Sequence, residues 1–326
     1  MWISIDTAYE LVLKVMTRAR FTDAEARIIA DHLVGCELRG VASGGFSRAL
    51  SIVERMAAGR SATPMRVVRE TPVSALLDGG DQTGYLVAHR AAEIALDKAK
   101  ASGLAAVSAN NTWYTGMYAH YLEKIAREGF VALCAGSSSP RVAPFGSSEG
   151  CFGTNPIAFG FPCDGDPIVV DTATSALIVG DVVLASRLGE PLPEGYAYDP
   201  QGQPTTDPAA ALAGAIGVWG GHRGSALAIA IQLLGVLAGA PALPADYRDC
   251  GFFIMVLRPD LFMPAETFRA RVAAYASTVR NARPLSPDQP VRMPFDRSVE
   301  HRRRCVARGE LQIDTALYAE LTRAAA

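Results

Sequence analysis

Residues 142–181, VAPFGSSEGCFGTNPIAFGFPCDGDPIVVDTATSALIVGD, decide how this chain folds. Two short apolar runs within this stretch, at 156–161 and 168–171, have the length and the β-branched or aromatic content of strands. A loop of small polar residues borders each run, at 153–155 before the first and at 171–175 after the second. Such loops expose backbone N–H groups and short hydroxyls, which suit the binding of a phosphate or a carboxylate.

Outward from this stretch, the spacing of apolar residues predicts a mixed α/β (α+β) chain. Alternation with a period of two predicts further strands at 66–70, 73–77, 104–109, 130–135 and 252–257. Helical periodicity predicts helices at 5–18, 22–40, 49–58, 84–102, 118–128, 176–187, 223–237, 265–281, 298–308 and 315–325. Thr22 and Glu25 have the spacing of a capping box. Because only some strands alternate with helices, we expect a mixed sheet and not a regular strand-helix repeat.

The composition indicates a globular protein of about two lobes. Its 326 residues are 49% hydrophobic and 20% charged, with a formal net charge of −2, which gives no basic field for nucleic acid or an anionic membrane. The first ten residues lack a basic region followed by an apolar one, so we expect no signal peptide and a cytoplasmic location. The apolar stretch 226–243 includes Gln232 and Pro241, which favour a buried helix over a membrane span.

Several common active-site motifs are missing from the sequence. The G-x-G-x-x-G fingerprint of dinucleotide-binding Rossmann folds, the P-loop and the G-x-S-x-G elbow are all absent. The six cysteines contain no C-x-x-C pair, and the five histidines show no pairing on one helical face, so we predict no metal site. The small polar loops therefore remain as the candidates for ligand binding, although each one alone also fits a turn or a helix cap.

Taken in order and spacing, these loops resemble the malate/L-lactate dehydrogenase family of the second type, which lacks the Rossmann fold. The resemblance covers most of the chain. It is carried by Glu37-Leu38-Arg39-Gly40, residues 43–48, Asn111 to Gly116, residues 142–162, DTATSALIVGD at 171–181, and GGHRGSAL at 220–227. The closest match in motif is to the Δ1-piperideine-2-carboxylate and Δ1-pyrroline-2-carboxylate reductases.

The resemblance implies a largely antiparallel central sheet with flanking helices and a nicotinamide cofactor, NADPH or NADH. It implies a central domain at 63–259 and a helical segment at 1–62 that packs with the C-terminal helices at 260–326. It also implies a homodimer with active sites near the interface. The residues expected to bind the cofactor are Ser137, Ser138, Ser139, Thr154, Asn155, Asp171, Thr172, Ala173, Thr174, His222, Arg223 and Gly224.

The sequence departs from the family pattern at both histidines expected to transfer protons. Most relatives have S-H-G where this chain has Ser43-Gly44-Gly45, and Tyr114 stands in place of a second histidine. Reduction of a ketone needs a proton donor, most often histidine. A protonated cyclic imine is already electrophilic and needs a carboxylate that stabilises its positive charge. The departures therefore favour an imine substrate.

Asp181 is the predicted stabilising carboxylate, since the related imine reductases tend to have aspartate at this position. Arg48 is predicted to bind the substrate carboxylate with its guanidinium fork, and Thr154 to hydrogen-bond it. Ser43 is a further candidate in the site. Each assignment has a structural alternative: Asp181 as a helix-end carboxylate, Arg48 in an ion pair, and Tyr114 as a packing aromatic beside Trp113.

We therefore predict an NAD(P)H-dependent reductase that converts a cyclic or N-substituted imino acid into an L-amino acid. One alternative is a 2-oxoacid/2-hydroxyacid dehydrogenase that uses Tyr114 as proton donor. Another is a redox-inactive relative that binds a ligand, which the two lost histidines would permit.

Overall fold

The computed structural model describes residues 1–58, 62–245 and 248–326, and its centre is a seven-stranded sheet. The strand order is β2-β3-β4-β11-β5-β7-β8, and every neighbouring pair is antiparallel except β3 and β4. The strands are β2 (Arg66–Thr71), β3 (Ser74–Thr83), β4 (Leu104–Trp113), β11 (Phe252–Leu257), β5 (Val131–Gly136), β7 (Ile157–Phe161) and β8 (Ile168–Thr172). The predicted mixed fold with a largely antiparallel sheet is confirmed.

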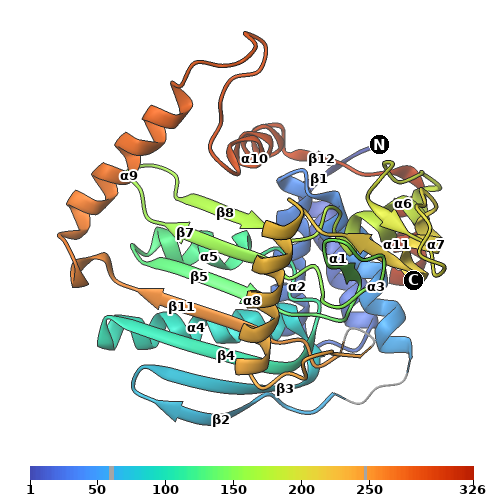
Figure 1. Cartoon of the computed structure of the whole chain (residues 1–326), viewed down its shortest axis with the longest axis horizontal. Coiled ribbons are helices and arrows are strands. Elements are labelled where there is room, and N and C mark those ends of the chain that lie inside the picture. Colours follow the sequence, from blue (N-terminus) through green and yellow to red (C-terminus); the bar gives the residue numbers. More distant parts are fainter. Residues whose placement is uncertain (59–61, 246–247) are drawn as a thin grey trace.

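Helices cover both faces of this sheet. The helices α4 (Gly84–Ser102) and α5 (Ala119–Arg127) pack on one face, and α8 (His222–Leu237) crosses the other (Figure 1). Alternate residues of β11 point into the layer under α4 and α5, where Phe252, Ile254 and Val256 are fully buried. This alternation is the signature of a strand with two different faces.

The two ends of the chain form one helical layer beside the sheet. The short strands β1 (Trp2–Ser4) and β12 (Glu310–Gln312) pair antiparallel. The first three helices, α1 (Ile5–Arg18), α2 (Asp23–Leu38) and α3 (Phe46–Ala57), share a core with α11 (Thr315–Ala325). The predicted capping box is present, since Thr22 and Glu25 bond each other's backbone at the start of α2. α10 (Asp296–Arg308) packs against α2, whereas α9 (Ala265–Arg280) projects away from the sheet (Figure 1).

A second, smaller sheet lies beside the helical layer. It has the strand order β6-β10-β9, from β6 (Val142–Ala143), β10 (Ala215–Gly217) and β9 (Ala197–Tyr198). α7 (Pro208–Ala213) packs on this sheet, and α6 (Val179–Leu188) packs on α7. These elements share a separate cluster of buried apolar side chains. Asp207 caps α7 by accepting from Ala209 and Ala210 N–H. The two short 3₁₀ helices are η1 (Ala42–Gly44) and η2 (Pro259–Leu261).

The structure refines the expectation of a buried helix within 226–243. Only one side of α8 is covered, and Ile229, Leu233 and Leu237 on the other side are 50%, 61% and 70% exposed. Its sequence is apolar on every side, so periodicity alone does not indicate which side is covered. Within the described ranges, no helix combines the length and the apolar character that crossing a bilayer requires.

Candidate active site

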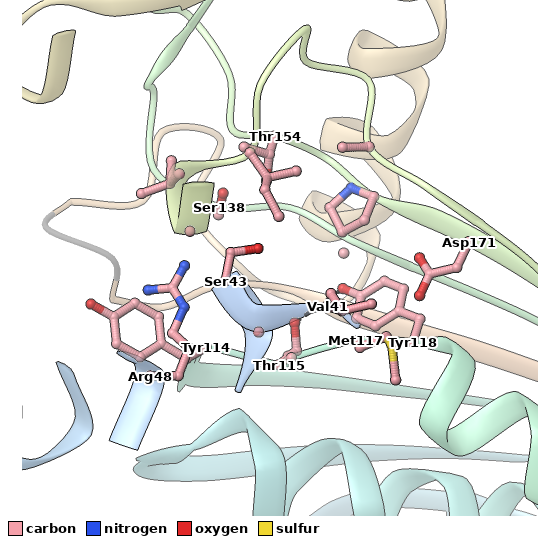
Figure 2. Close-up of a pocket in the computed structure, with 18 of the residues that line it drawn as sticks. Val41, Ser43, Arg48, Tyr114, Thr115, Met117, Tyr118, Ser138, Thr154 and Asp171 are labelled. Carbon is pink, nitrogen blue, oxygen red and sulfur yellow. Dashed lines mark hydrogen bonds between the residues drawn. The ribbon is translucent and has the colours of Figure 1, made fainter. Parts of the chain in front are cut away.

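A cavity of about 380 Å³ lies where the central sheet, the N-terminal helical layer and the smaller sheet meet. Its wall comes from every part of the chain: η1 and α3, the loop between β4 and α5, the residues after β5 and β8, the start of α6, and Phe295 near the C-terminal end (Figure 2). Among its described lining residues there is no histidine. No imidazole of the described lining can therefore donate a proton in this cavity.

Ser43 and Arg48 enter the cavity from the turn that joins α2 to α3. Ser43 is buried in η1, and Arg48 projects from the first turn of α3 (Figure 2). Within the described chain, no carboxylate lies at ion-pair distance from Arg48, and its guanidinium stacks 4.8 Å from the centre of the Tyr114 ring. The ion-pair alternative for Arg48 is therefore not found. A guanidinium without a carboxylate in a cavity suits an anionic ligand.

A buried carboxyl group, which has no assigned role from the sequence, holds this turn in place. Glu37 on α2 is 8% exposed, and its Oε1 accepts a 2.6 Å hydrogen bond from Phe46 N–H at the start of α3. Burial raises the pKa of Glu37 to about 8. A side chain at Gly45 has no room, because an added Cβ would lie 2.1 Å from Glu37 Oε1. Gly44 stands where most relatives have the histidine, and the next residue, Gly45, packs tightly on Glu37.

Tyr114 lies at the other side of Arg48. Its backbone is left-handed, with φ of 52°, a conformation that is uncommon for a residue with a bulky side chain. The ring packs edge-on to Trp113 and lies under the Arg48 guanidinium, and its hydroxyl points away from Ser43 in the close-up (Figure 2). This orientation favours a role in positioning Arg48 over direct proton donation.

Asp171 lies on the opposite wall of the cavity from Arg48 (Figure 2). It is the last residue but one of β8, and its carboxylate accepts from Ala119 N–H at 2.8 Å at the N-terminus of α5. The backbone of Tyr118 also bonds it. Desolvation raises the pKa of Asp171 to about 6, in spite of these two hydrogen bonds. Asp171 is therefore a carboxyl group of the cavity that titrates near neutral pH.

Half of the residues predicted to bind the cofactor line this cavity and the others do not. Those that line it are Ser137, Ser138, Thr154, Asp171, Thr172 and Ala173. His222 and Arg223 are exposed at the N-terminus of α8, outside the cavity, and Gly224 is buried beside them. An added Cβ at Gly224 would lie 1.6 Å from Trp219 O. The cavity thus contains the loops after β5 and β8, and the α8 end stands apart from it.

Asn155 and Thr174 serve the scaffold. The Asn155 amide is fully buried and donates to Ala228 O and Gln232 Oε1, both at 2.8–2.9 Å on α8. Thr174 Oγ1 donates to Thr154 O at 3.0 Å. Both side chains donate to the protein, whereas Asn155 Oδ1 is buried without a hydrogen-bond partner. Contact of these two residues with a cofactor remains a prediction. Ser139 is also buried away from the cavity.

Asp181 lies in the first turn of α6 and is exposed, whereas its neighbours Val179 and Gly180 line the cavity. Gly180 packs so closely that an added Cβ would lie 2.9 Å from Ser43 O and 3.1 Å from Arg48 Nη2. The helix that carries Asp181 therefore touches the site, but its carboxylate is directed to solvent. Its contact with a substrate remains a prediction.

Two buried histidines lie directly behind the cavity wall. His32 Nε2 accepts from Met117 N–H at 2.9 Å, and the His32 and His120 ring centres are 4.4 Å apart. Burial lowers the pKa of His32 to about 3 and that of His120 well below its usual value, so both are neutral at neutral pH. Met117 lines the cavity, so these histidines hold the wall. The sequence contained no pattern that paired them.

We expect these histidines to make the fold sensitive to acid. A histidine whose pKa is lowered in the folded state contributes stability above its unfolded pKa of 6.5, and this stability is lost as pH falls toward the folded value. For each of these histidines, the free energy of unfolding should fall by about 1.4 kcal/mol for every pH unit below 6.5. Urea unfolding at pH 7 and pH 5 measures this slope.

The variant His32→Gln keeps an acceptor for Met117 N–H but does not titrate, so its stability should fall less between the two pH values. The exposed His222 is the control, and His222→Gln should keep the wild-type slope. Equal slopes in wild type and His32→Gln would contradict the assignment.

Comparison with known proteins places the chain in a family. The family model described as malate/L-lactate dehydrogenase matches residues 3–322. The chain is 34% identical over 334 residues to the Δ1-pyrroline-2-carboxylate/Δ1-piperideine-2-carboxylate reductase of Pseudomonas aeruginosa, with 98% of each chain covered. It is 30% identical over 322 residues to L-sulfolactate dehydrogenase of Methanocaldococcus jannaschii, which covers 96% of this chain and 93% of that one. The crystal structure of a dehydrogenase from Sinorhizobium meliloti has a TM-score of 0.92 at 30% identity, over 100% and 98% of the two chains.

Fold and site together define an oxidoreductase. The chain belongs to the malate/L-lactate dehydrogenase family, as its sequence motifs predicted. Members of this family are NAD(P)-dependent dehydrogenases and reductases. Imino-acid reductases and 2-hydroxyacid dehydrogenases match it about equally well, so the choice of substrate rests on the chemistry of the cavity.

Proposed function

We propose that this enzyme reduces the C=N bond of a cyclic or N-substituted imino acid to give an L-amino acid. The observation that carries this proposal is a cavity that offers a guanidinium without a carboxylate partner and no described histidine. Arg48 would bind the substrate carboxylate through its two parallel N–H groups. A protonated imine then needs no imidazole donor, because it already carries the proton that a ketone must acquire.

The chain fits a nicotinamide cofactor through close backbone approach and an uncapped helix end. An added Cβ at Gly153 would lie 2.9 Å from the Ser138 carbonyl carbon, a backbone atom, so only glycine allows these two loops to meet. The N-terminus of α8 has no side-chain cap, which leaves backbone N–H groups for a phosphate beside Arg223. We propose NADPH, with NADH as the alternative, held by Ser138, Thr154 and the α8 end. When bound, the cofactor supplies the hydride.

A carboxylate that stabilises the iminium is the second requirement of this proposal. Asp171 is better placed for it than Asp181, because Asp171 lines the cavity and Asp181 is exposed. With a pKa of about 6, the Asp171 carboxyl is mostly ionised at neutral pH and lies in a desolvated wall, where its charge acts strongly. We therefore propose Asp171 as this carboxylate, and we keep Asp181, the residue favoured by the family motif, as its rival.

A 2-oxoacid reductase is the second candidate function, favoured by the similarity to sulfolactate dehydrogenase. In that case Tyr114 would donate the proton to the substrate oxygen. Its hydroxyl would have to turn toward Ser43, because it points away from that side in the structure (Figure 2).

We further propose that the enzyme is a homodimer. The apolar side chains of Ile229, Leu233 and Leu237 form an exposed stripe on α8, and water-exposed apolar stripes of this kind are typical of interfaces. The described cysteines are all free thiols, which supports a reducing compartment such as the cytoplasm.

Cofactor oxidation, followed by absorbance, separates the candidate functions. The substrates are Δ1-piperideine-2-carboxylate, Δ1-pyrroline-2-carboxylate, pyruvate with methylamine, and plain 2-oxoacids, each with NADPH and with NADH. We expect turnover of at least one imine. Turnover of 2-oxoacids alone would contradict the proposal, and a protein that neither turns over substrate nor binds cofactor would be a redox-inactive relative.

Three conservative variants then assign the roles. If Asp171 stabilises the iminium, Asp171→Asn should lower kcat by about 100-fold, and Asp181→Asn and Tyr114→Phe by much less. A larger loss in Asp181→Asn would transfer the role to that residue. The largest loss in Tyr114→Phe would favour the 2-oxoacid mechanism.

A further inference from the structure

A second cavity, of about 390 Å³, lies on the outer side of α5 and shares no lining residue with the active site. It is enclosed by α5, α2 and the first residues of α1, and Arg302 of α10 reaches into it. None of its residues has a role in the proposed reaction. We call it the α5 cavity.

The α5 cavity carries more positive than negative charge. Its lining includes the four cations Arg39, Lys124, Arg127 and Arg302 and the two carboxylates Asp31 and Glu123. This leaves an excess of two positive charges, four minus two. Side chains of like charge that are gathered in a partly desolvated space repel one another, so an excess of this kind favours the binding of an anion.

One carboxylate forms ion pairs with three of the guanidinium groups. Glu123 pairs with Arg39, with Arg127 at 2.7 Å and with Arg302 at 3.5 Å. Asp31 is engaged by the Tyr9 hydroxyl. Arg127 also pairs with Asp166 at 3.4 Å, outside the cavity lining, and Asp166 is shared with Arg303. The carboxylates Glu123 and Asp166 are therefore fewer than the four guanidinium groups that they serve.

Lys124 is the clearest sign of a missing anion. Its Nζ lies 2.9 Å from His120 Nε2, and across the described ranges no carboxylate lies at ion-pair distance from it. Burial depresses the pKa of His120 far enough that its ring is neutral and accepts from the ammonium group. Burial lowers the pKa of Lys124. Arg39 and Arg302 add to this effect, and Asp31 and Glu123 offset part of it. Asp31 and Glu123 act on this lysine only from beyond ion-pair distance, and its printed hydrogen bond goes to an imidazole, so its ammonium group has room for a direct anionic partner.

We propose that the α5 cavity is a binding site for a dianion of the phosphate class, held by Lys124, Arg127 and Arg302. Two charges on the ligand would match the excess in the cavity. Guanidinium groups bind phosphate oxygens through paired N–H groups, and the lysine ammonium binds them as a compact charge. A cavity of this size accepts inorganic phosphate with its water or a small phosphate ester.

The α5 cavity is mechanically connected to the active site. His120 lines it, and the His120 ring packs on His32, whose Nε2 accepts from Met117 N–H in the active-site wall. The first residue of the same helix, Ala119, donates to Asp171. A dianion bound to Lys124 therefore acts on the helix whose N-terminus positions Asp171, which gives it a route to influence the reaction.

The test of binding measures thermal unfolding of the full chain in inorganic phosphate and in sodium chloride of equal ionic strength. We expect Tm to rise to a plateau with phosphate and not with chloride. Arg302→Gln and Lys124→Gln should each weaken the phosphate midpoint at least tenfold. Arg303→Gln is the matched control, because Arg303 is the next residue on α10, pairs with Asp166 and does not line the cavity.

Two further measurements make the result decisive. Without phosphate, Arg302→Gln and Lys124→Gln should unfold at the wild-type Tm or above it, because each removes a repelling charge. A lower Tm would mean that these residues only stabilise the fold, and would overturn the proposal. Phosphate could also occupy the α8 end, so Arg223→Gln is included and should keep the wild-type midpoint.

Three outcomes contradict the site. They are a phosphate effect no larger than that of chloride, equal midpoints in Arg302→Gln and Arg303→Gln, and loss of the effect in Arg223→Gln alone. Succinate is the dicarboxylate comparison, and binding of succinate more tightly than phosphate would overturn the assignment to the phosphate class. None of these readouts depends on turnover, so they test the binding site independently of the proposed reaction.

Discussion

Replacing Arg48 with glutamine is expected to lower kcat/KM for a carboxylate substrate by about 100-fold, equal to roughly 2.7 kcal/mol of transition-state binding. Arg48 is the cavity cation that has no carboxylate partner in the described chain, and its stacking on Tyr114 fixes the plane of its guanidinium. The substrate carboxylate does not change during hydride transfer, so the loss should fall mainly on KM. Steady-state kinetics with the best substrate of the panel measures it.

Two further variants isolate the reason for this loss. Arg48→Lys keeps the charge but loses the planar fork and its contact with the Tyr114 ring, so it should recover only part of the activity. Arg55 is the matched control: it lies on the same helix, stacks 4.7 Å from Trp113 in the same manner, and does not line the cavity. Arg55→Gln should leave KM unchanged. A KM in Arg48→Gln within about twofold of wild type would exclude Arg48 as the carboxylate ligand.

Replacing Gly45 with alanine is expected to destabilise the fold by about 3 kcal/mol and to abolish most activity. The new Cβ would lie 2.1 Å from Glu37 Oε1, where no shift of a side-chain end relieves the contact without breaking the hydrogen bond from Phe46 N–H. The turn that moves carries Ser43, and α3 carries Arg48. Urea unfolding and steady-state kinetics measure the two effects.

Gly35→Ala is the control for this substitution. Gly35 lies on α2, the helix that carries Glu37, and an added Cβ would meet His120 at an ordinary contact distance of 3.7 Å. Alanine is favoured over glycine inside a helix, so this variant should be as stable as wild type or up to about 1 kcal/mol more stable. If Gly45→Ala behaved as Gly35→Ala does, Glu37 would not hold the turn in the way described.

Sequence patterns predicted the elements well because the forces that form them are local. Alternation along Phe252–Leu257 and the Thr22–Glu25 capping box are each visible within a few residues, and both are found in the structure. The covered side of α8 was not predictable, because an all-apolar helix carries no periodic signal and its coverage depends on the sheet behind it.

The site was predictable only in part for a related reason. The motif loops do gather at one cavity, but the side chains of Asn155 and Thr174 turn inward to bond the protein. Phe295 reaches the cavity from the far end of the chain and has no motif around it. Whether a polar residue faces a ligand or the scaffold is decided by partners distant in sequence, which a local pattern does not contain.

The pairing of β1 with β12 can form only late in the synthesis of this protein. The backbone nitrogen of Met1 donates to Ile313 O at 2.7 Å, so this contact waits for a residue 312 positions later. Ribosomes add about 5–20 residues per second, so the wait is roughly 15 to 60 s. During that time α1 and α2 have emerged while α11, which shares their core, has not. The faces of α1 and α3 that pack on α11 therefore stay uncovered until translation is nearly complete.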